Sequence, residues 1–193
     1  MSGLIGIGPD ETSGVIGEFP AQTGNQVLIS TQTASDVSGV AFSSSLITDT
    51  YDDYMLDINS AVPVTNGTEP FIQMSIDNGS AKATVYTGRN YDQLAGTGSG
   101  HEHNDLAHMV LGTSISHTAA DGGISSRVLF HDLRNASKWK HGSFFTSARH
   151  SSDRYAWQGG FECIATSAIN WINFKFSAGN VSSGRFNLYG IEK

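Results

Sequence analysis

The chain has 193 residues, of which 38% are hydrophobic and only 15% are charged. Its polarity comes from Ser, Thr, Asn and 22 glycines more than from Lys and Glu. This composition argues against a helical protein, because helices favour Ala, Leu, Glu, Lys and Arg. It suits short strands joined by tight turns, so the sequence predicts an all-β protein.

The net charge of −7 results from 18 acidic and 11 basic residues. A nucleic-acid partner is not expected, because binding to a phosphate backbone requires clustered Lys and Arg. One basic cluster is interleaved with aromatic residues, a pattern also compatible with stacking on single-stranded nucleic acid. We interpret it instead as a strand pair with a mixed-charge outer face. The cluster comprises Arg134, Lys138, Lys140, Arg149 and Arg154, with Trp139, Phe144, Phe145 and Tyr155.

The single cysteine, Cys163, lies in an apolar run and excludes an intramolecular disulfide, so we predict a buried, inert thiol. The first six residues lack the positive and sustained apolar regions of a signal peptide. No run approaches the ~18 apolar residues that span a bilayer. We therefore expect synthesis in a reducing cytoplasm and no membrane insertion.

Residues 1–25 differ from the rest of the chain. The sequence of residues 2–6 recurs in similar form at residues 13–17, and frequent glycines disfavour regular structure. The segment is nevertheless too apolar for a solvated tail. We predict a docking arm over residues 1–25 that is ordered by contact with another chain; the alternative is that it folds back on its own domain. The side chains expected at this interface are Leu4, Ile5, Ile7, Val15, Ile16 and Phe19.

Residues 26–193 show the alternation of apolar and polar residues that is typical of strands. The expected strands are 26–31, 37–42, 53–62, 70–77, 82–88, 107–115, 126–133, 140–147, 157–165, 168–176 and 184–191. An Asn78-Gly79 turn is expected to join residues 70–77 and 82–88 in a hairpin. Residues 91–106 are expected to form the longest loop.

About ten short strands with frequent turn signals predict a two-sheet antiparallel β-sandwich of the jelly-roll type, with an extended N-terminal arm. The expected core is Leu56, Ile58, Ile72, Met74, Ile76, Val85, Val128, Phe130, Ile172, Phe174, Phe176, Phe186 and Leu188.

One group of residues resembles a metal site. His101, Glu102 and His103 are followed by Asp105 and His108, and zinc takes His and carboxylate ligands. Because the pair falls in a predicted glycine-rich loop, we expect neither a native metal site nor a cofactor. A metal-dependent enzyme stays open as an alternative, in which His101 and His103 converge with a third histidine. The candidates for that ligand are His117, His131, His141 and His150.

The acidic residues show no pattern of a catalytic or calcium site. Asp49, Asp52, Asp53 and Asp57 lack calcium-loop spacing, so a solvated face is predicted. His131 and Asp132 adjoin but point to opposite faces of a strand, and so do not form a dyad. Glu162 has no evident partner carboxylate for glycoside hydrolysis. We expect a protein without catalytic residues.

Carbohydrate binding is a further alternative, because several aromatic residues could stack on sugars. Most are expected in the core, whereas Trp171 falls out of phase with its apolar neighbours and is expected to be exposed. The candidates are Trp139, Trp157, Trp171, Tyr51, Tyr54, Tyr86 and Tyr91.

Two segments resemble a known kind of protein. Residues 168–191 contain an aromatic strand, a Ser-Ala-Gly-Asn turn, a Ser-Gly pair and a strand ending in Leu-Tyr-Gly. They resemble the closing hairpin of a jelly-roll module that occurs in virion proteins of tailed bacteriophages. Residues 13–17 are similar to a short leader of such proteins.

The resemblance implies a non-enzymatic structural protein located in the virion. We expect a capsid decoration or cement protein that forms a homotrimer and stabilises the shell by contact with the major capsid protein. The alternative is a tail fibre, a tail adaptor or a receptor-binding module, with tail proteins or a host surface glycan as partners.

Overall fold

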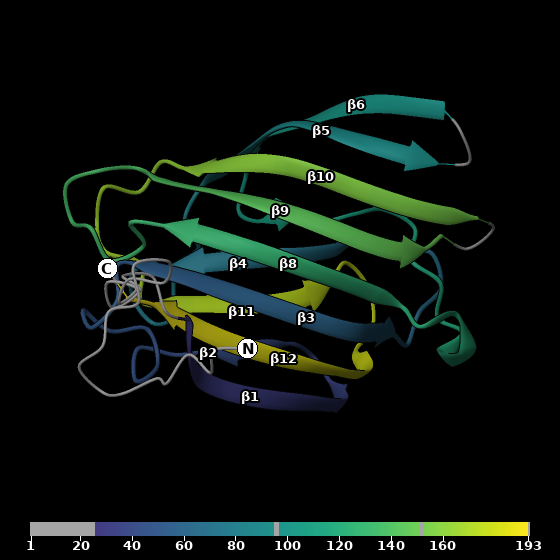
Figure 1. The fold of residues 1–193 in the computed structure, drawn as a ribbon, viewed down its shortest axis with the longest axis horizontal. Helices are drawn as coiled ribbons and strands as arrows, with labels where there is room; N and C mark the ends of the chain where they lie inside the picture. Colours follow the sequence, from purple (N-terminus) through teal and green to yellow (C-terminus); the bar gives the residue numbers. More distant parts are fainter. Residues whose placement is uncertain (1–25, 95–96, 151–152, 193) are drawn as a thin grey trace, which may run out of the picture.

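The computed structural model describes residues 26–94, 97–150 and 153–192, and over residues 85–106 it describes the backbone alone. These residues form two antiparallel sheets that pack face to face as a β-sandwich, as the composition and the alternation predict (Figure 1). Within these described ranges, regular helix is limited to one short 3-10 segment, η1 (Ala119–Asp121), before β8.

The larger sheet has eight strands in the order β1-β12-β3-β8-β9-β10-β5-β6. They are β1 (Gln26–Val37), β12 (Val181–Ile191), β3 (Asp53–Pro63), β8 (Ile124–His131), β9 (Lys140–Arg149), β10 (Arg154–Cys163), β5 (Val85–Leu94) and β6 (Thr97–Leu106). The smaller sheet has the order β2-β11-β4-β7. Its strands are β2 (Val40–Phe42), β11 (Trp171–Phe176), β4 (Pro70–Ser75) and β7 (Met109–Val110).

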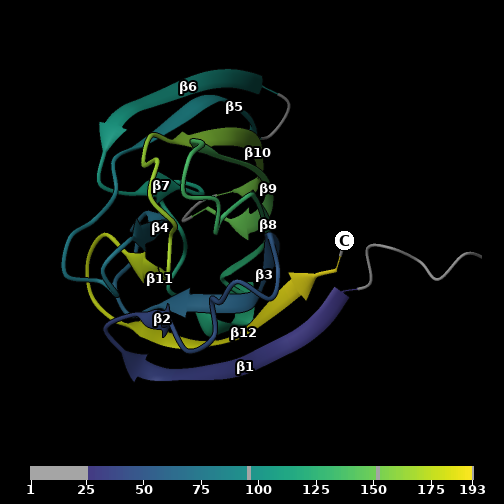
Figure 2. The same ribbon diagram turned by 90° about the vertical axis from the view of Figure 1, so that its left-hand side faces the viewer.

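Eight of these strands have jelly-roll topology. The chain crosses between sheets so that β1, β12, β3 and β8 lie in one layer, and β2, β11, β4 and β7 in the other. Two inserted hairpins, β5–β6 and β9–β10, pair with each other through β5 and β10 and widen the larger sheet. Figure 2 shows this sheet curving around the smaller one.

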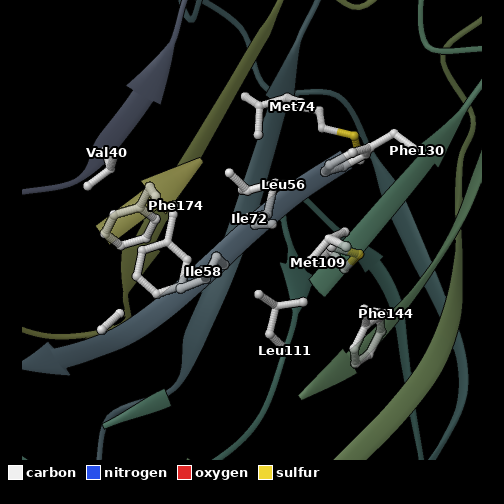
Figure 3. Close-up of a cluster of buried hydrophobic side chains, with 14 of the residues drawn as sticks. Val40, Leu56, Ile58, Ile72, Met74, Met109, Leu111, Phe130, Phe144 and Phe174 are labelled. Atoms are coloured by element: carbon white, nitrogen blue, oxygen red, sulfur yellow. The ribbon is translucent and has the colours of Figure 1, made fainter. Parts of the chain in front are cut away.

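The core lies between the layers and follows from period-2 alternation. On β8, Ile124, Val128 and Phe130 point inward and are fully buried, while their neighbours face outward. Figure 3 shows side chains of both sheets meeting, including Ile58 and Phe174. All predicted core residues with described side chains are buried except Ile76. The side chain of Val85 lies outside the described part.

Ile76 is 43% exposed, so its placement in the core was wrong. Strand β4 ends at Ser75, and a side-chain network then redirects the chain: the Ser75 hydroxyl donates to Asp77 (2.6 Å), and the Asp77 carboxylate accepts the Ala81 N–H (2.8 Å). Alternation therefore stops one residue before Ile76.

The predicted hairpin over residues 70–88 is also wrong. Asn78 and Gly79 do adopt positive φ values of 57° and 98°. The strands on either side nevertheless belong to different sheets, because β4 pairs with β11 and β7 whereas β5 pairs with β10 and β6. Likewise β11 and β12, the expected closing hairpin, lie in opposite layers. Alternation marks a buried face equally well in a hairpin and in a crossover between sheets.

Residues 91–106 are not a loop, because they complete β5 and form β6. Conversely, the predicted strand over residues 107–115 is reduced to Met109–Val110. Leu111 and Ile115 are fully buried beyond that strand. Composition was therefore misleading for both segments. Residues 91–106 form strands through sheet pairing although they are polar and rich in glycine, and Leu111 and Ile115 are buried in the core although they lie outside a strand.

Phe174 gives a direct test of the packing between the two sheets. Its ring lies 5.2 Å from that of Phe176 and 5.0 Å from that of Phe186 on the facing sheet. We expect Phe174→Ala to lower the free energy of unfolding by about 3–5 kcal/mol, because it leaves a cavity between the layers. Urea denaturation measures the change. Phe145→Ala, the same deletion at an exposed position, is the control and should change stability by about 0.5 kcal/mol or less.

Candidate functional site

The outward-pointing residues of β3, β8, β9 and β10 form one continuous surface, which we call the outer face. These strands run side by side in the middle of the larger sheet (Figure 1). Strand register arranges the side chains in rows across the sheet. One row contains Asp57, Arg127, Phe145 and Gln158, each opposite the next on the neighbouring strand.

Phe145 is the most exposed apolar residue of this face, at 55% of its surface. Its chain neighbour Phe144 points inward and is buried. Two adjacent aromatic residues on a strand must point to opposite faces, so one of them is exposed wherever only one face is covered. The Phe144-Phe145 pair was thus the signal in the sequence. Phe145 was named there only within the basic and aromatic cluster and not among the candidates for stacking on sugars.

A shallow depression of about 310 Å³ lies beside Phe145. Its lining comprises Asp57, Ile58, Asn59, Ser125, Ser126, Arg127, Phe145 and Ser147. The guanidinium Nε of Arg127 lies 3.6 Å from the Asp57 carboxylate, whose other oxygen accepts a hydrogen bond from Asn59 Nδ2 (3.1 Å). The depression therefore combines an aromatic face with paired charges, an amide and hydroxyl groups.

A second row of the outer face carries Asp53, His131, His141 and Glu162. His131 lies opposite His141, and His141 lies opposite Glu162. The Nδ1 atom of His131 is 3.0 Å from Asp53, and the other Asp53 oxygen accepts the Asp132 N–H (2.8 Å). The contact between His141 and Glu162, at 3.8 Å, is too long for a hydrogen bond.

The carboxylate partner of His131 is therefore Asp53 on the next strand, while Asp132 supplies only its backbone N–H to that pair. A carboxylate at Nδ1 orients an imidazole and leaves Nε2 for a proton or a ligand. Among the described residues, no group of three or more His, Cys, Asp or Glu side chains is arranged to hold a metal ion.

The predicted acidic patch is divided among separate partners. Asp49 binds Arg134 (2.8 Å), Asp53 binds His131, and Asp57 contacts Arg127. Asp52 and Asp53 also line a depression of about 290 Å³ at the strand ends, together with Asp132 and Glu192. Of these, Asp132 already contacts Lys138 (3.7 Å).

Lys140 lies at the start of β9 and is fully buried, so it does not belong to a mixed-charge outer face. Its ammonium group donates to the carbonyl oxygens of Lys138 (2.5 Å) and Ala165 (3.0 Å). Cys163 lies directly opposite it on β10 and is buried, as predicted. Burial lowers the pKa of Lys140 and raises that of the Cys163 thiol.

The predicted stacking residues do not form one platform. Trp157 and Tyr54 are buried in the core. Trp171 is half-buried. The Lys82 ammonium lies 4.4 Å from the centre of its ring. The backbone of Gly79 also lies against the ring, so close that a Cβ at this position would come within 2.9 Å of it. Trp139, in the connection before β9, is 47% exposed.

The remaining predicted residues are placed only in part. All six arm residues lie outside the described part of the chain. His101 and His103 lie on β6 instead of in a loop, and their side chains are not described. His108 packs against Phe71 with ring centres 4.5 Å apart and ring planes tilted by 43°. In the described residues, no helix has the length and apolarity needed to cross a membrane.

Comparisons with protein-family models, with curated proteins and with solved structures gave no match for this chain.

The buried lysine predicts a specific pH dependence. Because folding lowers the pKa of Lys140 below its ordinary value of 10.5, the unfolded chain binds more protons between the two pKa values. The contribution of Lys140 to the free energy of unfolding should thus rise with pH in that window and be level below it. We expect Lys140→Met to remove this contribution, so that the wild type gains stability relative to the variant as pH approaches 10.5. Urea titrations at several pH values measure the free energy of unfolding as a function of pH. Lys138→Met, at an exposed lysine, is the control and should keep the wild-type slope. Equal slopes in all three proteins would contradict the assignment of this pH dependence to Lys140.

Proposed function

We propose that this chain is a non-enzymatic structural protein of a phage virion that acts by attaching to other virion subunits. Its role in this proposal is that of a capsid decoration or cement protein, which stabilises the shell through contacts with sister subunits and the major capsid protein. The resemblance of residues 13–17 and 168–191 to jelly-roll virion proteins supports the class, and the jelly-roll order of the strands agrees with it.

The observation that carries the proposal is the free edge of β1. This strand has 12 residues and pairs with β12 along one side, and no described strand pairs with its other side. It contains no charged residue before Asp36, and Leu28 is 51% exposed. Proteins usually protect such edges with Lys, Pro or short strands. Among the described residues, the protection of this edge consists of a register irregularity between Leu28 and Ser30 and of the charged Asp36 near the end of the strand.

An unprotected edge is suited to strand addition, in which main-chain hydrogen bonds join a strand of another chain to the sheet. Residues 1–25 immediately precede β1, so the proposed arm and the free edge are adjacent along the chain. An arm of one subunit and an edge of another would together form a repeating contact. A homotrimer or a subunit bound to a capsid protein would both use this contact.

A second candidate is a tail adaptor or a receptor-binding module that recognises a host surface glycan. The exposed Phe145, beside a depression whose lining includes several polar side chains, is the observation that favours it.

Deletion of residues 2–20 tests the arm. The described sandwich starts at Gln26, so the truncated protein should keep its melting temperature. It should fail to join the particle, because the apolar contacts of the arm are lost. Thermal melts by circular dichroism and the occupancy of the protein in purified virions measure the two effects. Unfolding of the truncated protein, or full occupancy in particles, would disprove the docking arm.

A charge on the edge strand tests strand addition separately. Ser35 is exposed on β1, and a lysine on an edge strand disfavours pairing with a further strand. We expect Ser35→Lys to reduce incorporation into particles and self-association in sedimentation, while leaving the melting temperature nearly unchanged. Ala120→Lys adds the same charge to exposed η1, away from the sheet edge, and should assemble like the wild type. Equal assembly of both variants would argue against the edge as a contact.

A further inference from the structure

We propose that the depression beside Phe145 on the outer face binds a neutral pyranose sugar. In this site the Phe145 ring stacks against the apolar C–H face of the sugar, and Asp57, Asn59 and Arg127 hydrogen-bond its hydroxyl groups. The inference names a ligand class for this surface and is independent of the proposed role of β1, which lies at the edge of the same sheet.

The ring of Phe145 is presented for stacking. Along β9 its neighbours on the same face are Ser143 and Ser147, whose side chains are too short to cover an aromatic ring. Across the sheet it is flanked by Arg127 and Gln158. An exposed aromatic ring bordered by polar side chains suits a ligand that is apolar on one side and polar at its rim, as a pyranose is.

The polar groups match sugar hydroxyls, which both donate and accept hydrogen bonds. The Arg127 side chain is 66% exposed, so its outer N–H groups are free to donate to a ligand, and Asp57 accepts. Asn59 holds the second oxygen of Asp57 and fixes the carboxylate beside the guanidinium. Ser125 and Ser147 add hydroxyl groups to the lining.

The charge of the lining selects against acidic ligands. It contains one carboxylate and one guanidinium, which contact each other, so their net charge is zero. A phosphate or an acidic sugar bound to Arg127 would lie beside the Asp57 carboxylate and be repelled by it. A neutral sugar bridges both groups without separating them.

The dimensions agree with a single sugar ring. The depression of about 310 Å³ is at the lower end of the size range of small-molecule sites. The depression is open, so the rest of a glycan chain has room to continue over the sheet surface.

The site is held by a rigid part of the sheet. Beneath it, the buried hydroxyls of Ser126 and Thr146 lie 2.8 Å apart, and Ser126 donates to the carbonyl oxygen of Phe145 (3.2 Å). These bonds fix β8 against β9 under the ring. A preformed site loses little conformational entropy on binding a small ligand.

The surface differs from the centre of a protein interface, which is depleted of charged residues. Here Asp57 and Arg127 lie in the lining beside the exposed aromatic residue Phe145.

Amide chemical shifts of the ¹⁵N-labelled full chain test the proposal. Cellobiose, maltose, lactose and diacetylchitobiose are titrated to about 50 mM, because one shallow site gives affinities near the millimolar range. We expect at least one of them to shift the amides of residues 125–127 and 145–147. Phe145→Ala should weaken that binding about ten-fold or more. Trp139→Ala, which removes another exposed aromatic residue outside the depression, should bind like the wild type.

Further outcomes separate the alternatives. Arg127→Gln should weaken binding without abolishing it, and sialyllactose should bind more weakly than lactose. Tighter binding of sialyllactose would overturn the neutral ligand class. No shift with any of the four disaccharides, or equal losses in Phe145→Ala and Trp139→Ala, would overturn the site. If the saccharides leave the spectrum unchanged while Phe145→Ala abolishes self-association in sedimentation, the face is a subunit contact instead. The Ser35→Lys variant should bind the sugar normally, so failure of strand addition and failure of sugar binding are distinguishable.

Discussion

The pairing of the C-terminal strand between two N-terminal strands is the constraint on which the sandwich depends. Strand β12 lies between β1 and β3, so the larger sheet is complete only when residues 181–191 are in place. Phe186 on this strand packs against Phe174 of the smaller sheet, which connects the two layers. Contacts between such distant segments are costly in loop-closure entropy, and folding that requires them is expected to be slow.

The same arrangement determines which surfaces are free. Because β12 occupies the inner side of β1, the N-terminal strand becomes the edge of the sheet. The inserted hairpins have the opposite effect on β8, which would end the sheet in an eight-stranded jelly roll. They place β9, β10, β5 and β6 beyond it, so β8 and β9 become central strands. Phe145 therefore lies on a broad face instead of near an edge.

The sequence was sufficient to predict the fold class, because alternation depends only on which side of each strand is covered. Residues such as Leu56, Ile72 and Phe174 were placed correctly in the core for that reason. Connectivity was not predictable in the same way. Asn78-Gly79 can form its turn both in a hairpin within one sheet and in a crossover between sheets. Only packing between the sheets places β4 and β5 in different layers. The pairing of polar strand β6 depends on its neighbour β5 and not on its own composition.

The candidate site was less accessible to sequence reasoning, because its members are distant in the chain. Asp57, Arg127, Phe145 and Gln158 become one row only through strand register. Asp53 and His131 meet for the same reason, whereas Asp132, which adjoins His131 in the chain, contributes only its backbone N–H to this pair. Lys140 was misplaced because a lysine is rarely buried without a carboxylate, and here two backbone carbonyl groups replace it.

Strand addition at β1 and sugar binding at Phe145 are compatible in a single subunit. Added strands extend a sheet in its own plane and leave both faces unchanged. The row that contains Phe145 crosses β3, β8, β9 and β10, and β12 separates these strands from the edge. At about 4.8 Å between strands, β9 lies roughly 19 Å from β1, beyond the reach of a bound strand. A subunit attached through its edge would therefore keep its outer face open to solvent, and a shell of such subunits would present many copies of a weak sugar site. Multivalent contact of this kind gives strong attachment from individually weak interactions, provided that several sites engage one surface at once.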